Sequence, residues 1–246
     1  MRRPPFWAHA VALTLRKFGN HRDTSAEQAE AKAWAEGRSV SVAVALDSIG
    51  LSSDGERLPE FPEELRAEGA ALASRAPISM GGPGDMQLLY AATIRSRARR
   101  VVETGVAYGW SSLALLAGLE MNRDGRLISV DMPYPKMNNE SWVGIAVPAR
   151  FRASWTVVRE PDRFGLKKAL AAFENTIDLC HYDSDKSVQG RAYAYPLLWN
   201  ALKAGGIFIS DDIQDNLAFR DFVHERAVPF AVTEFQGKYV GIARKR

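Results

Sequence analysis

The chain has 246 residues, of which 46% are hydrophobic and 25% charged, and its formal net charge is +3. This composition excludes wholesale disorder and suffices for one large domain with a hydrophobic core. Its one dense basic cluster, Arg95, Arg97, Arg99 and Arg100, is more typical of a solvated helix end than of a nucleic-acid surface. The single cysteine, Cys180, excludes an internal disulfide and fits a reducing compartment, so we expect a cytoplasmic protein.

The first 18 residues join a basic start to a short apolar stretch. His9 interrupts this stretch, and Arg16 and Lys17 end it early, which indicates an amphipathic helix rather than a signal peptide. Such a helix is compatible with a homodimer. No run of the sequence approaches the ~20 apolar residues of a membrane span, so no membrane partner is expected.

Residues 1–75 differ from the rest of the chain because they are rich in Ala, Glu and Arg and lack strong strand signals. Capping residues predict a helix from about Thr24, and a second helix is expected over 62–75. The segment 51–63 contains glycine and two prolines and predicts a loop. We therefore interpret 1–75 as a helical N-terminal cap and 76–246 as the main domain.

From about residue 98, short apolar runs alternate with helical stretches. The runs that predict strands are 100–105, 126–132, 155–160, 177–183 and 206–212. The stretches that predict helices are 110–122, 139–152, 164–174 and 187–203. Near-continuous apolar strands separated by helices indicate a parallel sheet that is covered on both faces.

The last two apolar runs behave differently. Only Gln236 and Gly237 separate 230–235 from 238–245, so these two strands must be antiparallel. The predicted fold class is therefore α/β, with a doubly wound, mostly parallel seven-stranded sheet that ends in an antiparallel hairpin. This is not the plain arrangement of dinucleotide-binding domains.

A glycine-rich turn follows the first predicted strand. The strand ends at Glu103, Gly105 and Gly109 allow a tight turn, and a helix starts near Ser111. Glycines let the backbone approach a ligand closely, and the helix N-terminus suits a carboxylate. Glu103 can accept a hydrogen bond from a cationic amino group but would repel the diphosphate of a nicotinamide cofactor. A plain structural turn is the alternative.

Asp131 ends the second predicted strand. An acid at this position, one strand after a glycine turn, suits the two hydroxyls of a ribose. The alternative is an ordinary solvated carboxylate at a strand end.

Three further acids follow the fourth and fifth predicted strands. They are Asp183, Asp211 and Asp212. Carboxylates at neighbouring strand ends can converge on one cation such as Mg²⁺, and without a cation they would repel one another. The alternative is that they only cap the helices that follow.

Three motifs occur in order along the chain, at the first, fourth and fifth predicted strands. They are E-x-G-x-x-x-G-x-S at 103–111, I-D-L-x-x-x-D-x-D-K at 177–186 and L-K-x-G-G-x-x-x-x-D-D at 202–212. Together they resemble the class I S-adenosylmethionine-dependent methyltransferases, with their Rossmann-like methyltransferase fold. More narrowly, residues 78–246 are similar to the divalent-metal-dependent O-methyltransferases of the catechol, caffeoyl-CoA and macrolide-sugar types.

The resemblance implies which residues bind the cofactor S-adenosylmethionine. Glu103, Gly105, Gly109 and Ser111 would surround its methionine part, and Asp131 would hold the ribose. Glu160 would lie beside the adenine amine, a role for which Asp162 competes. Met80, in the loop before the domain, would also contact the cofactor.

The resemblance also implies a reaction. The expected acceptor is a small molecule with a hydroxyl group, Asp183, Asp211 and Asp212 would bind Mg²⁺, and Lys186 matches the lysine near the acceptor. His181 is the other candidate base, because strand alternation would point it the same way as Asp183. A metal-independent N-methyltransferase and a non-methyltransferase nucleotide-binding protein remain alternatives.

Overall fold

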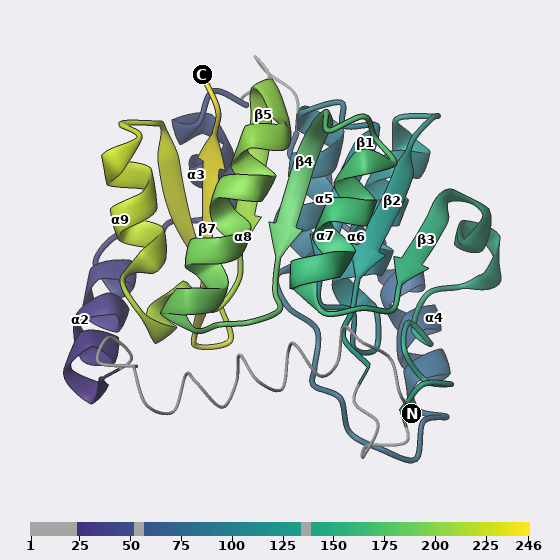
Figure 1. Ribbon diagram of the computed structural model, residues 1–246. Helices are drawn as coiled ribbons and strands as arrows, with labels where there is room; N and C mark the ends of the chain where they lie inside the picture. Colours follow the sequence, from purple (N-terminus) through teal and green to yellow (C-terminus); the bar gives the residue numbers. More distant parts are fainter. Residues whose placement is uncertain (1–23, 52–56, 134–138) are drawn as a thin grey trace.

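The computed structural model describes residues 24–51, 57–133 and 139–246 (Figure 1). Its centre is one seven-stranded sheet with the strand order β3-β2-β1-β4-β5-β7-β6. The strands are β1 (Arg100–Thr104), β2 (Arg126–Val130), β3 (Trp155–Val158), β4 (Ile177–Tyr182), β5 (Leu202–Ser210), β6 (Phe230–Phe235) and β7 (Lys238–Arg244). All seven predicted strands are therefore present.

The pairing of the strands confirms the predicted fold class. β1 pairs in parallel with β2 and β4, and β2–β3 and β4–β5 are also parallel. β7 alone runs against its neighbours and lies between β5 and β6. The chain order reverses between β1 and β4, and ligands of open α/β sheets bind in the crevice at such a point.

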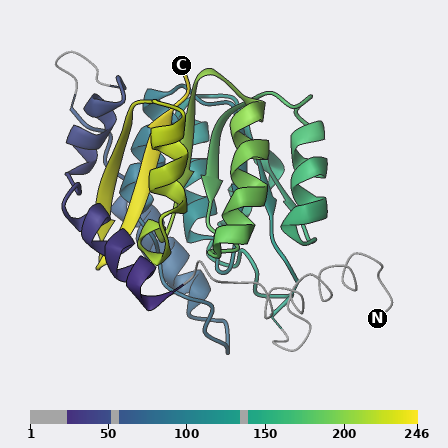
Figure 2. The same cartoon turned by 60° about the vertical axis from the view of Figure 1, so that its left-hand side comes forward.

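Helices cover both faces of the sheet. They are α2 (Ser25–Glu36), α3 (Val42–Ser48), α4 (Glu63–Ala73), α5 (Met86–Arg95), α6 (Trp110–Met121), α7 (Asp162–Ala171), α8 (Val188–Ala201) and α9 (Ala218–Glu225), with 3₁₀ turns η1 (Ala149–Ser154) and η2 (Ile213–Asp215). Figure 2 shows α7, α8 and α9 side by side on one face, with α5 and α6 on the other. No helix of the described ranges is long and apolar enough to cross a membrane.

Alternation along the strands produces two hydrophobic cores. On β1, Val101 joins the core under α3, α5 and α6, whereas Val102 joins the core under α7, α8 and α9. Leu179 and Cys180 divide in the same way on β4. Because successive side chains of a strand point to opposite faces, each strand contributes to both cores.

The helix predicted over 139–152 is wrong. Residues 140–146 form turns, and a short 3₁₀ helix follows after Pro148. Gly144 has a φ of 73°, and a Cβ there would lie 2.3 Å from the Trp155 ring, so the backbone is shaped by close packing against β3. The 3.6-residue spacing of apolar side chains does not reveal such a contact.

The described part of the predicted cap shares a core with the main domain. Thr24 caps α2 through its side chain, as its residue type predicts. Leu46 and Ile49 near α3, and Phe61 before α4, are buried in the same core as Val101. The predicted amphipathic helix at 1–18 lies outside the described residues.

Candidate active site

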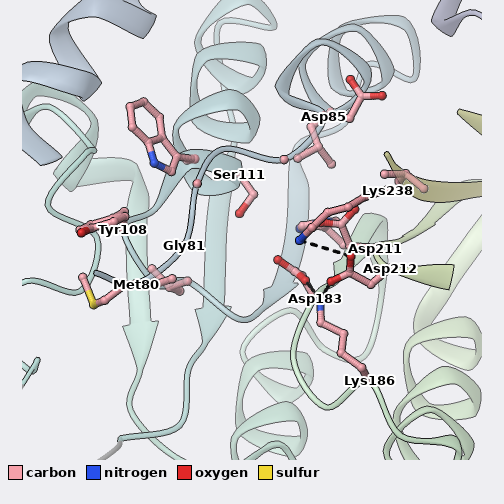
Figure 3. A pocket seen from close by; sticks show the side chains of 18 residues that line it. Met80, Gly81, Asp85, Tyr108, Ser111, Asp183, Lys186, Asp211, Asp212 and Lys238 are labelled. Carbon is pink, nitrogen blue, oxygen red and sulfur yellow. Dashed lines mark hydrogen bonds and ion pairs between the residues drawn. The ribbon is translucent and has the colours of Figure 1, made fainter. Parts of the chain in front are cut away.

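Two neighbouring cavities lie at the carboxyl ends of the strands around the β1–β4 reversal. The first, of about 200 Å³, is called the glycine-turn cavity, and it is lined by Met80, Gly105, Val106, Ala107, Asp131, Asn139, Asp183 and Ser184. The second, of about 260 Å³, is called the carboxylate cavity, and its lining includes Trp110, Ser111, His181, Lys186, Asp211 and Asp212 (Figure 3). Met80, Val106, Ala107 and Asp183 line both, so the two cavities share a wall.

The glycine-rich turn shapes the first cavity. Gly105 has a φ of 80°, and a Cβ there would lie 2.2 Å from the carbonyl oxygen of Asp183. A glycine at this position therefore lets the turn after β1 contact the loop after β4. Gly109 has a φ of 88° and packs against Gly144 and Val147, so it lines neither cavity.

Asp131, the residue that the sequence predicts to bind the ribose hydroxyls, lines the glycine-turn cavity. Its Oδ1 accepts a hydrogen bond of 2.9 Å from the backbone N–H of Val106. Its Oδ2 is ion-paired with Arg159, which also contacts Glu140 at 3.1 Å. Ribose hydroxyls entering this cavity would therefore meet a carboxylate that already has a cationic partner.

The loop before α5 lines the carboxylate cavity, and its Met80 also lines the glycine-turn cavity. The hydroxyl of Tyr108 donates a 2.5 Å hydrogen bond to the carbonyl oxygen of Ile78. Asn139 contacts the Met80 sulfur at 3.5 Å from the other side. Figure 3 shows Met80 and Tyr108 on the side of the carboxylate cavity away from its acids. Met80 therefore lies between the two cavities, which suits the predicted contact with the cofactor.

The three predicted metal ligands come together, but around a lysine. The Lys186 ammonium is ion-paired with Asp183 and lies 2.5 Å from Oδ2 of Asp212. Lys238, from the start of β7, lies 3.4 Å from Oδ1 of Asp212. Asp211 completes the group, and Figure 3 shows all five residues on one side of the cavity.

These contacts shift the pKa values of Lys186, Asp212 and Asp211. Burial alone would lower the pKa of Lys186, but Asp183 and Asp212 raise it well above its usual value. Burial opposes the effect of Lys186 on Asp212, yet the net pKa of Asp212 is lowered. Burial and the neighbouring Asp183 raise the pKa of Asp211 to about 7. Lys186 is therefore a fixed cation at neutral pH and Asp212 a fixed anion.

This arrangement does not fit a preformed magnesium site. Oxygen donors are the right ligands for Mg²⁺, but two of the three carboxylates already pair with Lys186. Within 24–51, 57–133 and 139–246, no group of three acidic, histidine or cysteine side chains is arranged to hold a metal ion. The sequence predicts that a cation compensates these carboxylates, and in the structure Lys186 and Lys238 supply positive charge there.

Buried polar contacts fix the backbone that carries Asp211 and Asp212. Arg191 of α8 is fully buried and donates to the carbonyl oxygens of Asp211 at 3.1 Å and Asp212 at 2.6 Å. Asp212 has a φ of 51°, a left-handed conformation that costs about 1 kcal/mol or more in a non-glycine residue. Asn216 accepts from Arg191 and donates to the carbonyl oxygen of Lys186, so it links the two loops.

Two predicted cofactor ligands lie outside the cavities. Glu103 is fully buried beneath them and lines neither one. Glu160, at the end of β3, is ion-paired with Lys168 of α7 and also lines neither cavity. Ser111 and His181, by contrast, both line the carboxylate cavity.

The sequence analysis missed several polar residues of the site, among them Asp85, Asn139, Arg159, Arg191 and Lys238. Asp85 caps α5 and accepts a hydrogen bond from Thr233 of β6, so it joins two distant segments. Only the β5–β7 pairing brings Lys238 to the carboxylates, and the sequence signal for the hairpin contains no hint of this.

Comparisons with known proteins agree with this architecture. Residues 102–213 match a family model described as a methyltransferase domain. None of the curated proteins matches the chain. Among solved structures, an O-methyltransferase from Bacillus cereus in complex with S-adenosylhomocysteine is similar, with a TM-score of 0.53 at 18% identity over 86% of this chain and 100% of that one.

Two further structures share the fold. TomG, an O-methyltransferase of tomaymycin synthesis from Streptomyces achromogenes solved with S-adenosylmethionine, has a TM-score of 0.56 at 16% identity over 77% of this chain and 92% of that one. The Podospora anserina methyltransferase PaMTH1, solved with S-adenosylhomocysteine, has a TM-score of 0.53 at 16% identity over 93% of this chain and 100% of that one. These findings agree with the resemblance drawn from the motifs: residues 102–213 match a methyltransferase-domain model, and the chain has the fold of these S-adenosylmethionine-dependent methyltransferase structures.

Proposed function

We propose that this chain is an S-adenosylmethionine-dependent enzyme that methylates a hydroxyl group of a small molecule. The observation that carries the proposal is the shared wall of the two cavities. The residues that line both cavities are Met80, Val106, Ala107 and Asp183. On one side lies Asp131, the predicted ribose ligand, and on the other lie charged side chains and a histidine. Methyl transfer needs two such compartments in contact, one for each reactant.

The glycine-turn cavity suits the cofactor. Gly105 brings backbone to its wall, and Asp131 offers a carboxylate that is positioned by the Val106 N–H. These features support the binding of a nucleoside whose ribose hydroxyls donate to Asp131. The solved relatives that contain S-adenosylmethionine or its product support the same assignment.

The carboxylate cavity suits the acceptor. Tyr108 and Trp110 give it an aromatic wall, and Lys186 and His181 are its candidate catalytic residues. The raised pKa of Lys186 keeps it protonated, so it is a donor that can hold the acceptor oxygen rather than a base. His181 is the better candidate base, because an imidazole has an accepting nitrogen when it is neutral. Burial lowers its pKa, but Glu103, Asp211 and Asp183 outweigh burial, so the net pKa is raised.

The chain's part in the reaction is positioning and proton transfer. S-adenosylmethionine, when bound, supplies an activated methyl group. Lys186 and the cavity wall orient the acceptor oxygen in line with that methyl, and His181 takes the hydroxyl proton. The cofactor, held beside Gly105 and Asp131, would supply the methyl group to the acceptor oxygen and would keep the electron pair of its sulfur–carbon bond.

The proposed mechanism does not use the predicted Mg²⁺. A divalent cation at Asp183, Asp211 and Asp212 would have to displace the ammonium of Lys186. Metal dependence is therefore a separate prediction, checked by turnover with and without EDTA. Full activity in EDTA would mean that the reaction needs no metal and that Lys186 is the cation beside the carboxylates. Loss of activity in EDTA that Mg²⁺ restores would support the metal site predicted from the sequence.

Binding is the first test of the proposed function. Isothermal titration calorimetry should detect micromolar binding of S-adenosylhomocysteine and no binding of NAD. Incubation with S-adenosylmethionine and a panel of phenols, sugars and amines, followed by mass spectrometry and NMR of the product, then locates the new methyl group. Tight NAD binding without S-adenosylhomocysteine binding would overturn the proposal, and a methyl found only on nitrogen would replace it by N-methylation.

A further inference from the structure

A row of polar side chains crosses the sheet beneath the carboxylate cavity. Glu103 of β1 lies directly beside Ser129 of β2 on one side and His181 of β4 on the other, because it is in register with both. Val101, Leu127 and Leu179, two residues earlier on each strand, belong to the hydrophobic core on this face. All three polar residues are at most 1% exposed. Burying an ionisable acid in such a place is costly unless its charge has a partner.

One oxygen of the Glu103 carboxylate is fully engaged. Ser112 of α6 and Ser129 both donate 2.6 Å hydrogen bonds to Oε2. The indole N–H of Trp155 donates to the Ser129 hydroxyl at 2.8 Å, so the hydroxyl hydrogen of Ser129 is directed to Glu103. The orientation of the carboxylate is therefore fixed by three side chains from three elements.

The other oxygen faces His181. Oε1 of Glu103 lies 3.6 Å from Nδ1 of His181, and neither atom has a hydrogen-bond partner within the described residues. A shift of a few tenths of an ångström would close this gap to a hydrogen bond. A carboxylate can only accept, so Nδ1 must carry the hydrogen, and in the neutral ring Nε2 is then the unprotonated nitrogen.

His181 connects this buried pair to the cavity. It lines the carboxylate cavity, whereas Glu103 does not. Because Nδ1 faces Glu103 beneath the cavity, the opposite edge of the ring, with Nε2, is the part left for an acceptor. This geometry differs from the sequence prediction, in which Glu103 receives the cofactor's amino group.

We infer that Glu103 is a positioning residue for His181, which fixes the ring and its tautomer so that Nε2 can take the acceptor's proton. The inference rests on the proposed function. When the acceptor O–H bond breaks, its proton goes to Nε2, the oxygen's electron pair forms the bond to the methyl carbon, and the resulting imidazolium keeps its Nδ1–H towards the Glu103 carboxylate. The same division of labour between an acid, a histidine and a hydroxyl recurs on unrelated folds.

The tautomer of His181 tests the inference without any turnover. Long-range ¹H–¹⁵N NMR, at a pH where the ring is neutral, should show the proton of His181 on Nδ1 in the wild type. In Glu103→Gln the serines hold the amide oxygen, which leaves the amide NH₂ facing Nδ1, so the proton should move to Nε2. A wild-type ring protonated on Nε2, or the same tautomer in both proteins, would overturn the inference.

Kinetics separate this role from cofactor binding. Glu103→Gln should lower kcat about 100-fold or more, with the Kd of S-adenosylhomocysteine within about threefold of wild type. His181→Gln should cause a similar loss, and the double variant should be no slower than His181→Gln alone. If Glu103→Gln instead weakens S-adenosylhomocysteine more than about tenfold, Glu103 serves the cofactor and the inference fails. Failure of the wild type to bind S-adenosylhomocysteine would count against the proposed function, not against the NMR result.

Discussion

The ammonium of Lys186 lies 2.5 Å from Oδ2 of Asp212 and at the same time pairs with Asp183. Lys186 thus occupies the centre of the acidic group that the sequence assigns to a metal. Lys186→Met should lower the free energy of unfolding by about 1–3 kcal/mol, because it leaves partly buried carboxylates without their cation. It should also create a site for a divalent cation, so millimolar MgCl₂ should raise the Tm of the variant by several degrees and leave the wild type unchanged.

Thermal denaturation with and without MgCl₂ measures both effects. Lys203→Met is the matched control, because it removes another lysine–aspartate pair. The ammonium of Lys203, at the start of β5, lies 2.6 Å from Oδ1 of Asp178 in β4. Mg²⁺ should not stabilise that variant. Equal stabilisation of wild type and Lys186→Met by Mg²⁺ would show that Lys186 does not compete with a metal.

Gly105 lets the turn after β1 pack closely against the Asp183 carbonyl oxygen. Gly105→Ala should destabilise the fold by about 3 kcal/mol or more, because the new Cβ would lie 2.2 Å from that oxygen and the residue has a φ of 80°. Gly237→Ala provides the control, since Gly237 has a φ of 77° but no atom within 4 Å of the built Cβ. It should lose only about 1 kcal/mol. Urea denaturation of both variants checks the difference, and similar losses would contradict the role of the close contact.

The fold was largely predictable because its signals are local. The strands stand out as short apolar runs, and the two-residue turn at Gln236 and Gly237 forces an antiparallel hairpin. The exception is α5, which is apolar on nearly every side and gives no amphipathic signal. α5 buries seven of its ten residues and was missed for this reason.

The site was less predictable because it depends on pairings between distant segments. The positions of Asp131, Asp183 and Lys186 at strand ends followed from the motifs. The partners that decide their charge did not: Arg159 on Asp131 and Lys238 on Asp212 arise only when the sheet is assembled. The separation of Glu103 from the cavities likewise depends on which side of β1 it faces.

The Asp131–Arg159 pair predicts how the cofactor binds. Asp131→Asn should weaken S-adenosylhomocysteine binding about 10–100-fold, because a neutral amide accepts less strongly from the ribose hydroxyls. Arg159→Met should bind equally well or more tightly, because it frees the Asp131 carboxylate from its ion pair. Isothermal titration calorimetry of both variants gives the comparison. Weak binding by Arg159→Met as well would mean that Arg159 itself contacts the cofactor.

Asp162 predicts a pH dependence of stability. Burial raises its pKa from 3.8 to about 6, although the Ser184 hydroxyl donates to it and opposes the shift. The folded protein therefore holds this proton more tightly than the unfolded chain does. The resulting stabilisation is fully present below pH 3.8 and is lost as the pH rises through about 6.

Asp162→Asn removes this titration and keeps an oxygen that can accept from Ser184. Relative to the variant, the wild type should lose about 1–2 kcal/mol of unfolding free energy between pH 4 and 7, less than a full two-unit shift implies because Asp162 is only half-buried. Urea denaturation across this range, for both proteins, provides the measurement. The difference between the two curves isolates Asp162 from the other carboxylates, which titrate equally in both. If the difference does not change with pH, Asp162 titrates alike in the folded and unfolded chain.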